Sequence, residues 1–203
     1  TLPAILVKRQ LNRGIEGLAL DGDGFLWAML QNPLVNPDAA AFKAAANARL
    51  LKIDPVSGAA VAEHVYALEP MTGFKGEEKK AQSTARISEL THIGGTRFLL
   101  DDRTDRTTHI LEIDTAGATD ILGSRWDDPA TGPTLEQTDL AAAGIAQVGK
   151  RLVLDSAKLP QLPTKVEGVA LVDGVLYLIN DDDFGIEGAH TTISAIGGPT
   201  PGQ

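Results

Sequence analysis

The sequence predicts an all-β fold made of repeated four-stranded units, and three observations support this prediction. Residues 14–31, 86–103 and 165–181 share one pattern, in which a Glu beside apolar residues precedes a Gly-containing turn and a second apolar run. The apolar runs are short, rich in Val, Ile and Leu, and bounded by Gly, Asp and Pro, which favours strands over helices. A further apolar run that ends in Asp and a turn follows the first two segments, at 48–58 and 108–117. Repeated four-stranded units of this kind are typical of a β-propeller.

The first unit illustrates how the strands are assigned. Turn residues separate its apolar runs, so strands are expected at roughly 15–20, 25–30, 49–54 and 61–68. Residues 21–24 read DGDG, a strong hairpin signal because both Gly residues can adopt positive φ. Asp54 and Asp114 close apolar runs and are followed by Pro, Ser, Thr and Gly residues that favour turns.

The repeats account for only part of a propeller. We expect the whole chain, 1–203, to be one propeller segment with units at about 12–69, 86–155 and 164–196, preceded by the last strand of another blade at Ala4–Gln10. Propellers carry roughly 4–8 blades. The chain is therefore predicted to be the C-terminal half, about three blades, of a six- or seven-bladed ring. The remaining blades would come from a missing N-terminal segment or a second chain; a distorted or open assembly of sheets is the alternative.

Three inserts interrupt the predicted strands. Residues 36–48 are Ala-rich and begin with Asn-Pro-Asp, which predicts a short surface helix. Residues 70–86 are polar and contain Glu77-Glu78-Lys79-Lys80, which suggests a solvated loop or helix. The first part of residues 124–150 is rich in Pro, Gly and Asp. It continues into LEQTDLAAAGIA, where a second short helix is expected.

Composition excludes several classes of function. The 203 residues carry 18 Lys+Arg against 27 Asp+Glu, a formal charge of −9, which argues against a nucleic-acid partner. With no Cys, the chain has no disulfide, zinc-thiolate site or thiol nucleophile. No apolar run reaches the length of about 18–20 residues that a membrane-spanning helix needs.

The repeated glutamates are the first candidates for a functional site. Glu16, Glu89 and Glu167 each lie near the start of a unit's first strand, which is the strand closest to the channel in a propeller. Carboxylates gathered around one axis repel one another, and a hard cation relieves this repulsion. Calcium prefers oxygen ligands, so the three glutamates are candidate calcium ligands and catalytic residues. The alternative is that each Glu binds backbone amides and joins neighbouring blades.

Acidic residues at the ends of second strands extend the candidate metal set. Asp102 closes one such strand, and Asp181 and Asp182 follow another, so all three are predicted metal ligands. The run 181–183 can equally be a solvated loop.

Basic residues accompany the glutamates. Arg13 and Arg86 each lie three residues before a Glu, Lys165 lies two before Glu167, and Arg103 follows Asp102. Guanidinium groups match phosphate oxygens in a bidentate way, so these four residues are candidate phosphate ligands. Ordinary salt bridges are the alternative for Arg13, Arg86 and Lys165.

The chain resembles the phytase-like, or "esterase-like activity of phytase", domain family. The resemblance covers about residues 12–190, and the segments that carry it are NRGIEGLAL (12–20), ISEL (87–90), RFLLDDR (97–103), ILEIDTAGATDI (110–121) and VEGVALVDGVLYLINDDDFG (166–185). It implies a propeller related to β-propeller phytases, calcium-dependent phosphoester hydrolysis, and a periplasmic or extracellular location. One departure is Asp102, where family members often carry Glu, and a shorter carboxylate there weakens the case for a metal ligand.

Together, the residues and the resemblance lead to one functional hypothesis and one alternative. The hypothesis is a calcium-dependent phosphoester hydrolase in which metal-activated water attacks a phosphorylated small molecule at the channel mouth. The alternative is a non-catalytic, calcium-stabilised extracellular propeller whose mouth binds a protein or a glycan.

Overall fold

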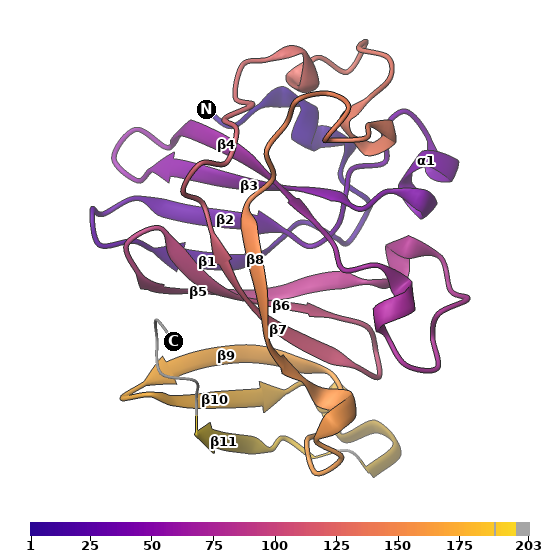
Figure 1. Cartoon of the computed structure of the whole chain (residues 1–203), viewed down its shortest axis with the longest axis vertical. Coiled ribbons are helices and arrows are strands. Elements are labelled where there is room, and N and C mark those ends of the chain that lie inside the picture. The colour runs from indigo at the N-terminus through magenta and orange to yellow at the C-terminus, as the bar shows by residue number, and fades with distance from the viewer. Residues whose placement is uncertain (189, 198–203) are drawn as a thin grey trace.

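The computed structural model describes residues 1–188 and 190–197, and its strands form three antiparallel sheets (Figure 1). The first sheet has the order β1-β2-β3-β4, the second β5-β6-β7-β8, and the third β9-β10-β11. The prediction of an all-β fold is confirmed. The strand bounds are β1 Ile15–Leu20, β2 Leu26–Leu30, β3 Asn47–Asp54, β4 Ala59–Ala67, β5 Arg86–Gly94, β6 Arg97–Arg103, β7 Thr108–Asp114, β8 Gly149–Asp155, β9 Val166–Val172, β10 Val175–Asn180 and β11 Ile193–Gly197.

Asp side chains stabilise both hairpin turns of this kind in the first sheet. Asp21 Oδ1 accepts hydrogen bonds from the backbone N–H groups of Asp23 and Phe25 at 2.9 and 2.8 Å, while Gly24 adopts a φ of +86°. Asp54 closes the turn between β3 and β4 in the same way, accepting from Val56 N–H at 2.9 Å. Asp side chains stabilise such turns because they imitate a backbone carbonyl.

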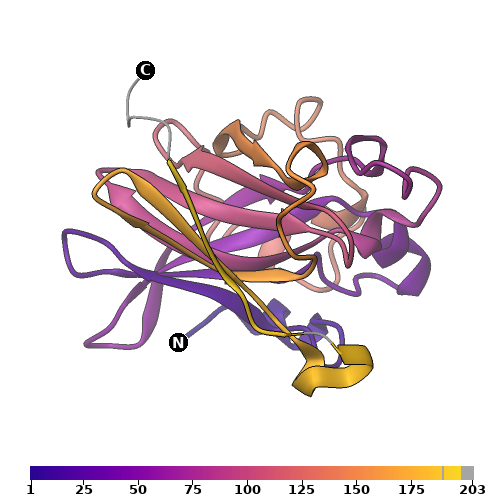
Figure 2. The same ribbon diagram turned by 90° about the horizontal axis from the view of Figure 1, so that it is seen from below.

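The three sheets stack face to face, with the second sheet in the middle (Figures 1 and 2). One apolar core lies between the first and second sheets and includes Trp27, Leu50 and Leu100. Another lies between the second and third sheets and includes Leu99, Val169 and Leu176. The first strands of the three sheets, β1, β5 and β9, are neighbours, so the starts of all three lie together.

The approach of β1 to β5 depends on one glycine. A Cβ atom added to Gly17 would lie 2.7 Å from Leu90 Cβ and 3.0 Å from Leu90 N. Leu90 is almost fully buried, so its side chain has no space into which to move. Glycine at position 17 therefore sets the spacing between the first two sheets.

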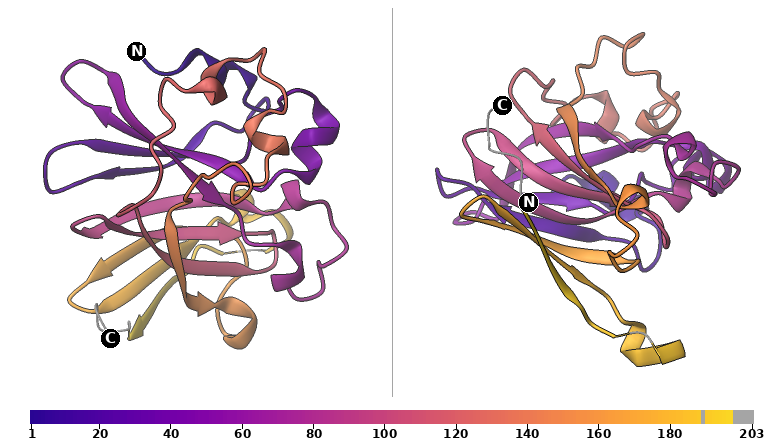
Figure 3. Two further views of the ribbon diagram at one scale, coloured as in Figure 1. Left: turned by 45° about the horizontal axis from the view of Figure 1, so that its top comes forward. Right: turned by 60° about the horizontal axis from the view of Figure 1, so that its bottom comes forward.

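Helical structure lies in the connections between strands and in the segment before β1 (Figure 3). The predicted helix in the first insert is α1 (Ala39–Ala44), capped by Asp38, whose carboxylate accepts from Ala40 and Ala41 N–H at 2.9 Å. The expected helix in residues 124–150 is limited to 3₁₀ turns. The 3₁₀ segments are η1 Ala4–Lys8, η2 Met71–Gly73, η3 Gln82–Thr84, η4 Arg125–Asp127, η5 Leu135–Gln137, η6 Ser156–Lys158 and η7 Asp183–Gly188.

The prediction of a strand at Ala4–Gln10 is wrong, because this segment contains the 3₁₀ turn η1. The turn places Ile5, which is fully buried, against Leu30 and Leu51 on the outer face of the first sheet. Burial of one side chain thus overrides the strand propensity of the Ile, Leu and Val residues.

The second insert is also less solvated than its charges suggest. Glu77 is buried and accepts hydrogen bonds from the Thr104 hydroxyl and, at 2.6 Å, from Lys80 Nζ. Phe74 stacks on His109 of β7 with ring centroids 4.4 Å apart. The insert is therefore fixed to the second sheet by both polar and aromatic contacts.

A buried charge network fixes the long insert between β7 and β8. Arg49 of β3 pairs with Glu63 of β4, with Asp127 at 3.3 Å, and with Glu136 at 3.9 Å. Three carboxylates surround one guanidinium, and burial raises the pKa of Glu63 to about 7 despite attraction to Arg49. We infer that this network retains a proton near neutral pH, because uncompensated buried charge is costly.

Replacing Gly17 tests the spacing of the first two sheets. Gly17→Ala is expected to lower the free energy of unfolding by about 1–3 kcal/mol, because the added methyl group overlaps Leu90 and forces the core apart. The matched control is Gly14→Ala, whose added Cβ would lie 3.9 Å from the Arg9 side chain, at an ordinary van der Waals distance. Urea unfolding of both variants measures the difference, and equal stability would show that β1 and β5 are not closely packed.

Candidate functional site

The repeated pattern brings equivalent positions of the three sheets to one end of the stack. Gln31 N–H, just after β2, donates to Gly14 O at 2.9 Å, and Asp181 N–H, just after β10, donates to Lys165 O at 2.9 Å. Ile87 N–H donates to Gln31 O at 2.9 Å and links the first two sheets there. The starts of first strands and the ends of second strands therefore meet at a common mouth.

A polar pocket of about 320 Å³ lies at this mouth, and we call it the mouth pocket. All four predicted phosphate ligands line it, together with two of the predicted metal ligands. Its lining residues are Asn12, Arg13, Gln31, Arg86, Arg103, Asp105, Lys165, Glu167, Asp181 and Asp183.

Three of the four basic residues pair with acidic residues of the same pocket. Arg86 pairs with Asp105, and Lys165 pairs with Asp183. Arg103 pairs with Glu167, which joins the second sheet to the third. Four basic and four acidic side chains line the pocket, so their formal charges balance.

Arg103 is the most firmly held of these residues. It is 2% exposed, and its Nε donates to the Ser88 hydroxyl at 2.7 Å while Nη1 donates to Thr104 O at 3.1 Å. Burial lowers the pKa of Arg103, and repulsion from Arg86 lowers it further, whereas Asp101 and Asp105 partly offset these effects. A guanidinium remains protonated under these conditions, so Arg103 supplies a fixed positive charge.

Arg13 differs from the other three basic residues. Its Nη1 donates to Asn32 Oδ1 at 2.8 Å and to Ser83 O at 3.1 Å, which are both uncharged acceptors. Within residues 1–188 and 190–197 it forms no ion pair, and burial, followed by repulsion from Arg86, lowers its pKa. Arg13 is therefore the basic group best placed to bind an incoming anion.

The three repeated glutamates do not occupy equivalent positions. In β1 the pairing register skips from Ile15 to Gly17, and in β9 it skips from Val166 to Gly168, so Glu16 and Glu167 are the bulged residues. In β5 the register skips from Ile87 to Glu89, so the bulged residue is Ser88. Glu89 thus matches Gly17 and Gly168, and the expected equivalence of Glu89 with the other two glutamates is wrong.

The predicted catalytic glutamates are consequently separated. Glu167 lines the mouth pocket, whereas Glu16 is exposed and lies outside its lining. Glu89 lines a different pocket, of about 330 Å³, beside Gly168 and Ile179. Burial raises the pKa of Glu89, although its Oε1 accepts from Leu90 N–H at 2.8 Å.

Asp102 faces away from the mouth pocket. Its side chain is fully buried, and Oδ2 accepts from the Tyr66 hydroxyl at 2.8 Å and from Glu69 N–H at 2.7 Å. Burial raises the pKa of Asp102 to about 7, against the lowering effect of these two hydrogen bonds. In this position Asp102 connects the first and second sheets.

Asp181 and Asp182 lie in the loop after β10, and only Asp181 lines the mouth pocket. Asp182 instead accepts from Phe184 N–H and from the Thr191 hydroxyl, each at 3.0 Å. Across the part of the chain that the structure describes, no three His, Asp or Glu side chains form a group able to hold a metal ion. The six predicted metal ligands are therefore not gathered at one point.

The predicted ligand set left out two acidic residues of the pocket, Asp105 and Asp183, although Asp183 belongs to the acidic run 181–183. Each follows a pocket residue by two positions, after Arg103 and Asp181, which is a signal that spacing could have provided. Burial alone would raise the pKa of Asp105, but attraction to Arg86 and the hydrogen bond from it outweigh burial and leave the pKa lowered. Asp105 therefore carries a negative charge beside Arg86.

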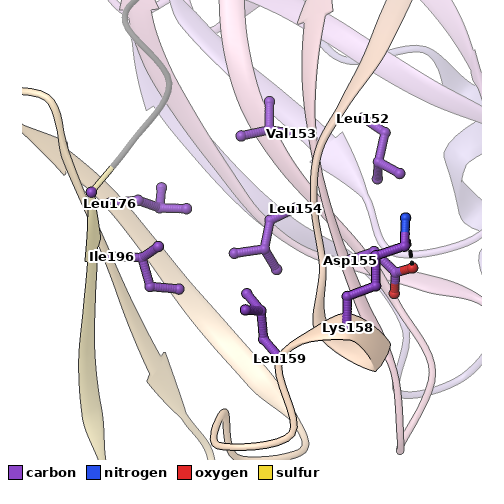
Figure 4. A pocket seen from close by; sticks show the side chains of 9 residues that line it. Leu152, Val153, Leu154, Asp155, Lys158, Leu159, Leu176 and Ile196 are labelled. Atoms are coloured by element: carbon purple, nitrogen blue, oxygen red, sulfur yellow. Dashed lines mark ion pairs between the residues drawn. The ribbon is translucent and has the colours of Figure 1, made fainter.

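A second pocket has a different chemical character (Figure 4). It has a volume of about 390 Å³ and lies between β8 and the third sheet, where Leu154, Leu176 and Ile196 line it. An ion pair of Asp155 and Lys158, 3.7 Å apart, is present at its lining. Its aliphatic walls offer few hydrogen bonds to a phosphate group, so the mouth pocket is the stronger candidate for a polar ligand.

The burial of Asp102 predicts a pH dependence of stability. Because the folded state raises its pKa to about 7, the unfolded chain releases this proton first as pH rises, and stability falls from about pH 4 to about pH 7. The side chain introduced by Asp102→Asn cannot ionise, so the free energy of unfolding of this variant should lack this part of the fall. Relative to the wild type, its free energy of unfolding should rise by more than about 1.4 kcal/mol between about pH 4 and about pH 7. Urea unfolding at several pH values measures this gain, and parallel curves for the two proteins would rule out the raised pKa.

Comparison with known proteins places the chain in a family. The family Phytase-like, described as esterase-like activity of phytase, matches residues 1–184. Comparisons with curated proteins and with solved structures gave no match. In residues 1–188 and 190–197, no helix is long and apolar enough to cross a membrane. The family match spans the first two sheets, β9 and β10 of the third sheet, and all the lining residues of the mouth pocket, and the chain therefore belongs to the phytase-like family.

Proposed function

We propose that this protein is a phosphoester hydrolase that binds the phosphate group of its substrate in the mouth pocket. The observation that carries the proposal is the convergence of Arg13, Arg86, Arg103 and Lys165, from three successive sheets, on one pocket. Membership of the phytase-like family supports a role of the hydrolase type. We further propose that the three sheets are consecutive propeller blades and that the protein acts in the periplasm or outside the cell.

The electrostatics of the pocket favour an anion as the ligand. Arg13 has uncharged partners, and Arg86 lies close enough to lower its pKa by repulsion. A phosphate group between the two guanidiniums would relieve that repulsion and accept charge-assisted hydrogen bonds from both. A phosphate that also accepts from Arg103 would displace the more exposed Glu167 from it.

Release of Glu167 provides a group for proton transfer. Its carboxylate is 40% exposed, so water can reach it. In the proposed reaction the oxygen of a water molecule forms a bond to phosphorus and passes its proton to Glu167. The bond from phosphorus to the ester oxygen breaks, and the leaving oxygen takes the proton from Glu167 to form an alcohol, which restores the Glu167 carboxylate. Glu167 is thus the proposed general base, while Glu16 and Glu89 have no part in this scheme.

Calcium is proposed for the same pocket with a smaller set of ligands than the sequence suggests. Glu167, Asp181 and Asp183 carry the oxygen atoms that calcium prefers. As placed, however, Glu167 pairs with Arg103 and Asp183 pairs with Lys165, so these carboxylates do not fit a calcium ion until their basic partners are released. A bound ion would neutralise phosphate charge, and we assign no reaction step to it.

Phosphate titration tests the binding part of the proposal. Inorganic phosphate added to the protein in a calorimeter should bind the wild type, and Arg13→Gln should weaken binding about tenfold or more, because one charge-assisted hydrogen bond is worth about 1.5–3 kcal/mol. Arg97→Gln is the matched control, since Arg97 lies at the opposite end of β6 and pairs with Glu112. Equal binding by all three proteins would contradict phosphate recognition at the mouth pocket.

Hydrolysis of p-nitrophenyl phosphate and bis(p-nitrophenyl) phosphate, with and without calcium, tests the catalytic part. The wild type should release p-nitrophenol, and Glu167→Gln should lower kcat by about 100-fold or more while phosphate still binds. Glu89→Gln is the control, because Glu89 lies outside the mouth pocket. If calcium raises the melting temperature but neither ester is hydrolysed, the alternative of a non-catalytic, calcium-stabilised protein that binds a protein or a glycan is correct.

A further inference from the structure

Asn32, which follows Gln31 after β2, is a buried polar residue whose amide group makes hydrogen bonds on both sides. It is 4% exposed, its Nδ2 donates to Ala85 O at 2.8 Å, and its Oδ1 accepts from Arg13 Nη1 at 2.8 Å. A backbone carbonyl can only accept and a guanidinium can only donate, so the amide fits these two partners in one orientation. Asn32 therefore connects a proposed phosphate ligand of the first sheet to the segment that enters the second sheet.

The bond to Ala85 also bears on the second arginine of the proposed phosphate site. Ala85 is fully buried, packs against Met71 and Phe74, and directly precedes Arg86. Its carbonyl group is thus held in place at the start of β5. One amide group contacts Arg13 on one side and the residue before Arg86 on the other, so the spacing of the two guanidiniums depends on it.

Arg13 and Arg86 need such a link because both are positively charged. Burial, followed by repulsion from Arg86, lowers the pKa of Arg13. Mobile side chains would relieve this repulsion by moving apart. Asn32 and the carbonyl oxygen of Ser83, which lies 3.1 Å from Arg13 Nη1, hold the guanidinium against it. Both acceptors are uncharged, so they hold Arg13 without neutralising it.

The position of Asn32 is used differently in the other two sheets. The pairing registers make Thr104 and Asp182 its equivalents in the second and third sheets. The Thr104 hydroxyl donates to Glu77, and Asp182 accepts from two groups of the segment between β10 and β11. A carboxylate at the first-sheet position would pair with Arg13, as carboxylates pair with the other three basic residues of the pocket. An amide at this position therefore leaves the charge of Arg13 available.

We propose that Asn32 is a positioning residue that holds Arg13 beside Arg86 with its charge uncompensated, and thereby sets the affinity of the mouth pocket for phosphate. This inference rests on the proposed function, because it assumes that phosphate lies between the two arginines. Asn32 is outside the lining of the pocket, so it acts through Arg13 and not by touching the ligand. A side chain that is ordered before the ligand arrives strengthens binding, because binding then involves less loss of conformational entropy.

Phosphate titration of two variants in a calorimeter tests this proposal. Asn32→Ala removes both hydrogen bonds and should raise the dissociation constant of inorganic phosphate about threefold to tenfold, because Arg13 is no longer ordered in advance. Asn32→Asp keeps the acceptor and adds a negative charge beside Arg13, so it should raise the dissociation constant about tenfold or more. A purely structural role predicts the reverse order, since Asn32→Asp preserves the shape of the side chain and one of its hydrogen bonds.

Asn47 of β3 provides the matched control. It is 7% exposed, and its Nδ2 donates to Leu135 O at 2.8 Å and to Thr138 O at 2.9 Å, outside the lining of the mouth pocket. Asn47→Ala and Asn47→Asp should lower the melting temperature, because they too remove hydrogen bonds of a buried amide. Their affinity for phosphate should equal that of the wild type.

Combining Asn32→Ala with Arg13→Gln tests whether Asn32 acts through Arg13. The double variant should bind phosphate as weakly as Arg13→Gln alone, because Asn32 then has no guanidinium to hold. Circular dichroism and thermal melts establish that each variant is folded, and if Asn32→Ala does not fold, Asn32→Asp decides alone.

Three outcomes would overturn the inference. Phosphate affinities of Asn32→Ala and Asn32→Asp equal to that of the wild type would exclude a positioning role and leave phosphate recognition intact. An effect of Asn32→Ala that is undiminished in the presence of Arg13→Gln would show that Asn32 does not act through Arg13. A wild type that binds no phosphate would overturn the proposed function and this inference with it.

Discussion

The close approach of the first strands is the constraint on which the rest of the structure depends. Gly17 permits β5 to lie against β1, with Leu90 packed where a side chain at position 17 would otherwise stand. Because β1, β5 and β9 are neighbours, the residues that flank them also converge. The mouth pocket is therefore a consequence of packing, because each sheet contributes polar side chains from the start of its first strand and from the end of its second strand or the segment that follows it.

The burial and mutual repulsion of the arginines in the mouth pocket are unfavourable, and binding of an anion would offset this effect. Arg103 is buried beside Arg86, and burial and repulsion lower its pKa. Glu167 and Asp105 compensate for this positive charge, and the pair of Arg103 with Glu167 also joins the second sheet to the third. In the proposed function, a dianionic ligand would replace these carboxylates as the partner of the guanidiniums. The ion pairs would then compete with the ligand.

Much of the fold could be predicted from the sequence because turn residues and short apolar runs are local signals. The strands of the first unit lie close to their expected positions, and the four basic residues do meet. The prediction of the site residues failed where a shift of one residue decides which face of the sheet a side chain points to. A β-bulge makes Ser88, and not Glu89, the equivalent of Glu16, and alternation along β6 turns Asp102 towards Tyr66 while Arg103 reaches the pocket. A residue-by-residue comparison of IEGL (15–18) with ISEL (87–90) and VEGV (166–169) reveals this shift of the Glu by one position.

The central claim is that three sheets converge to form one anion site at the mouth pocket. The most direct measurement is a crystal structure of the protein soaked with a phosphate analogue such as vanadate. We expect the anion between the guanidiniums of Arg13 and Arg86, with Glu167 displaced from Arg103 by the ligand. An anion bound elsewhere, with Arg103 and Glu167 still paired and the mouth pocket filled only by water, would contradict it.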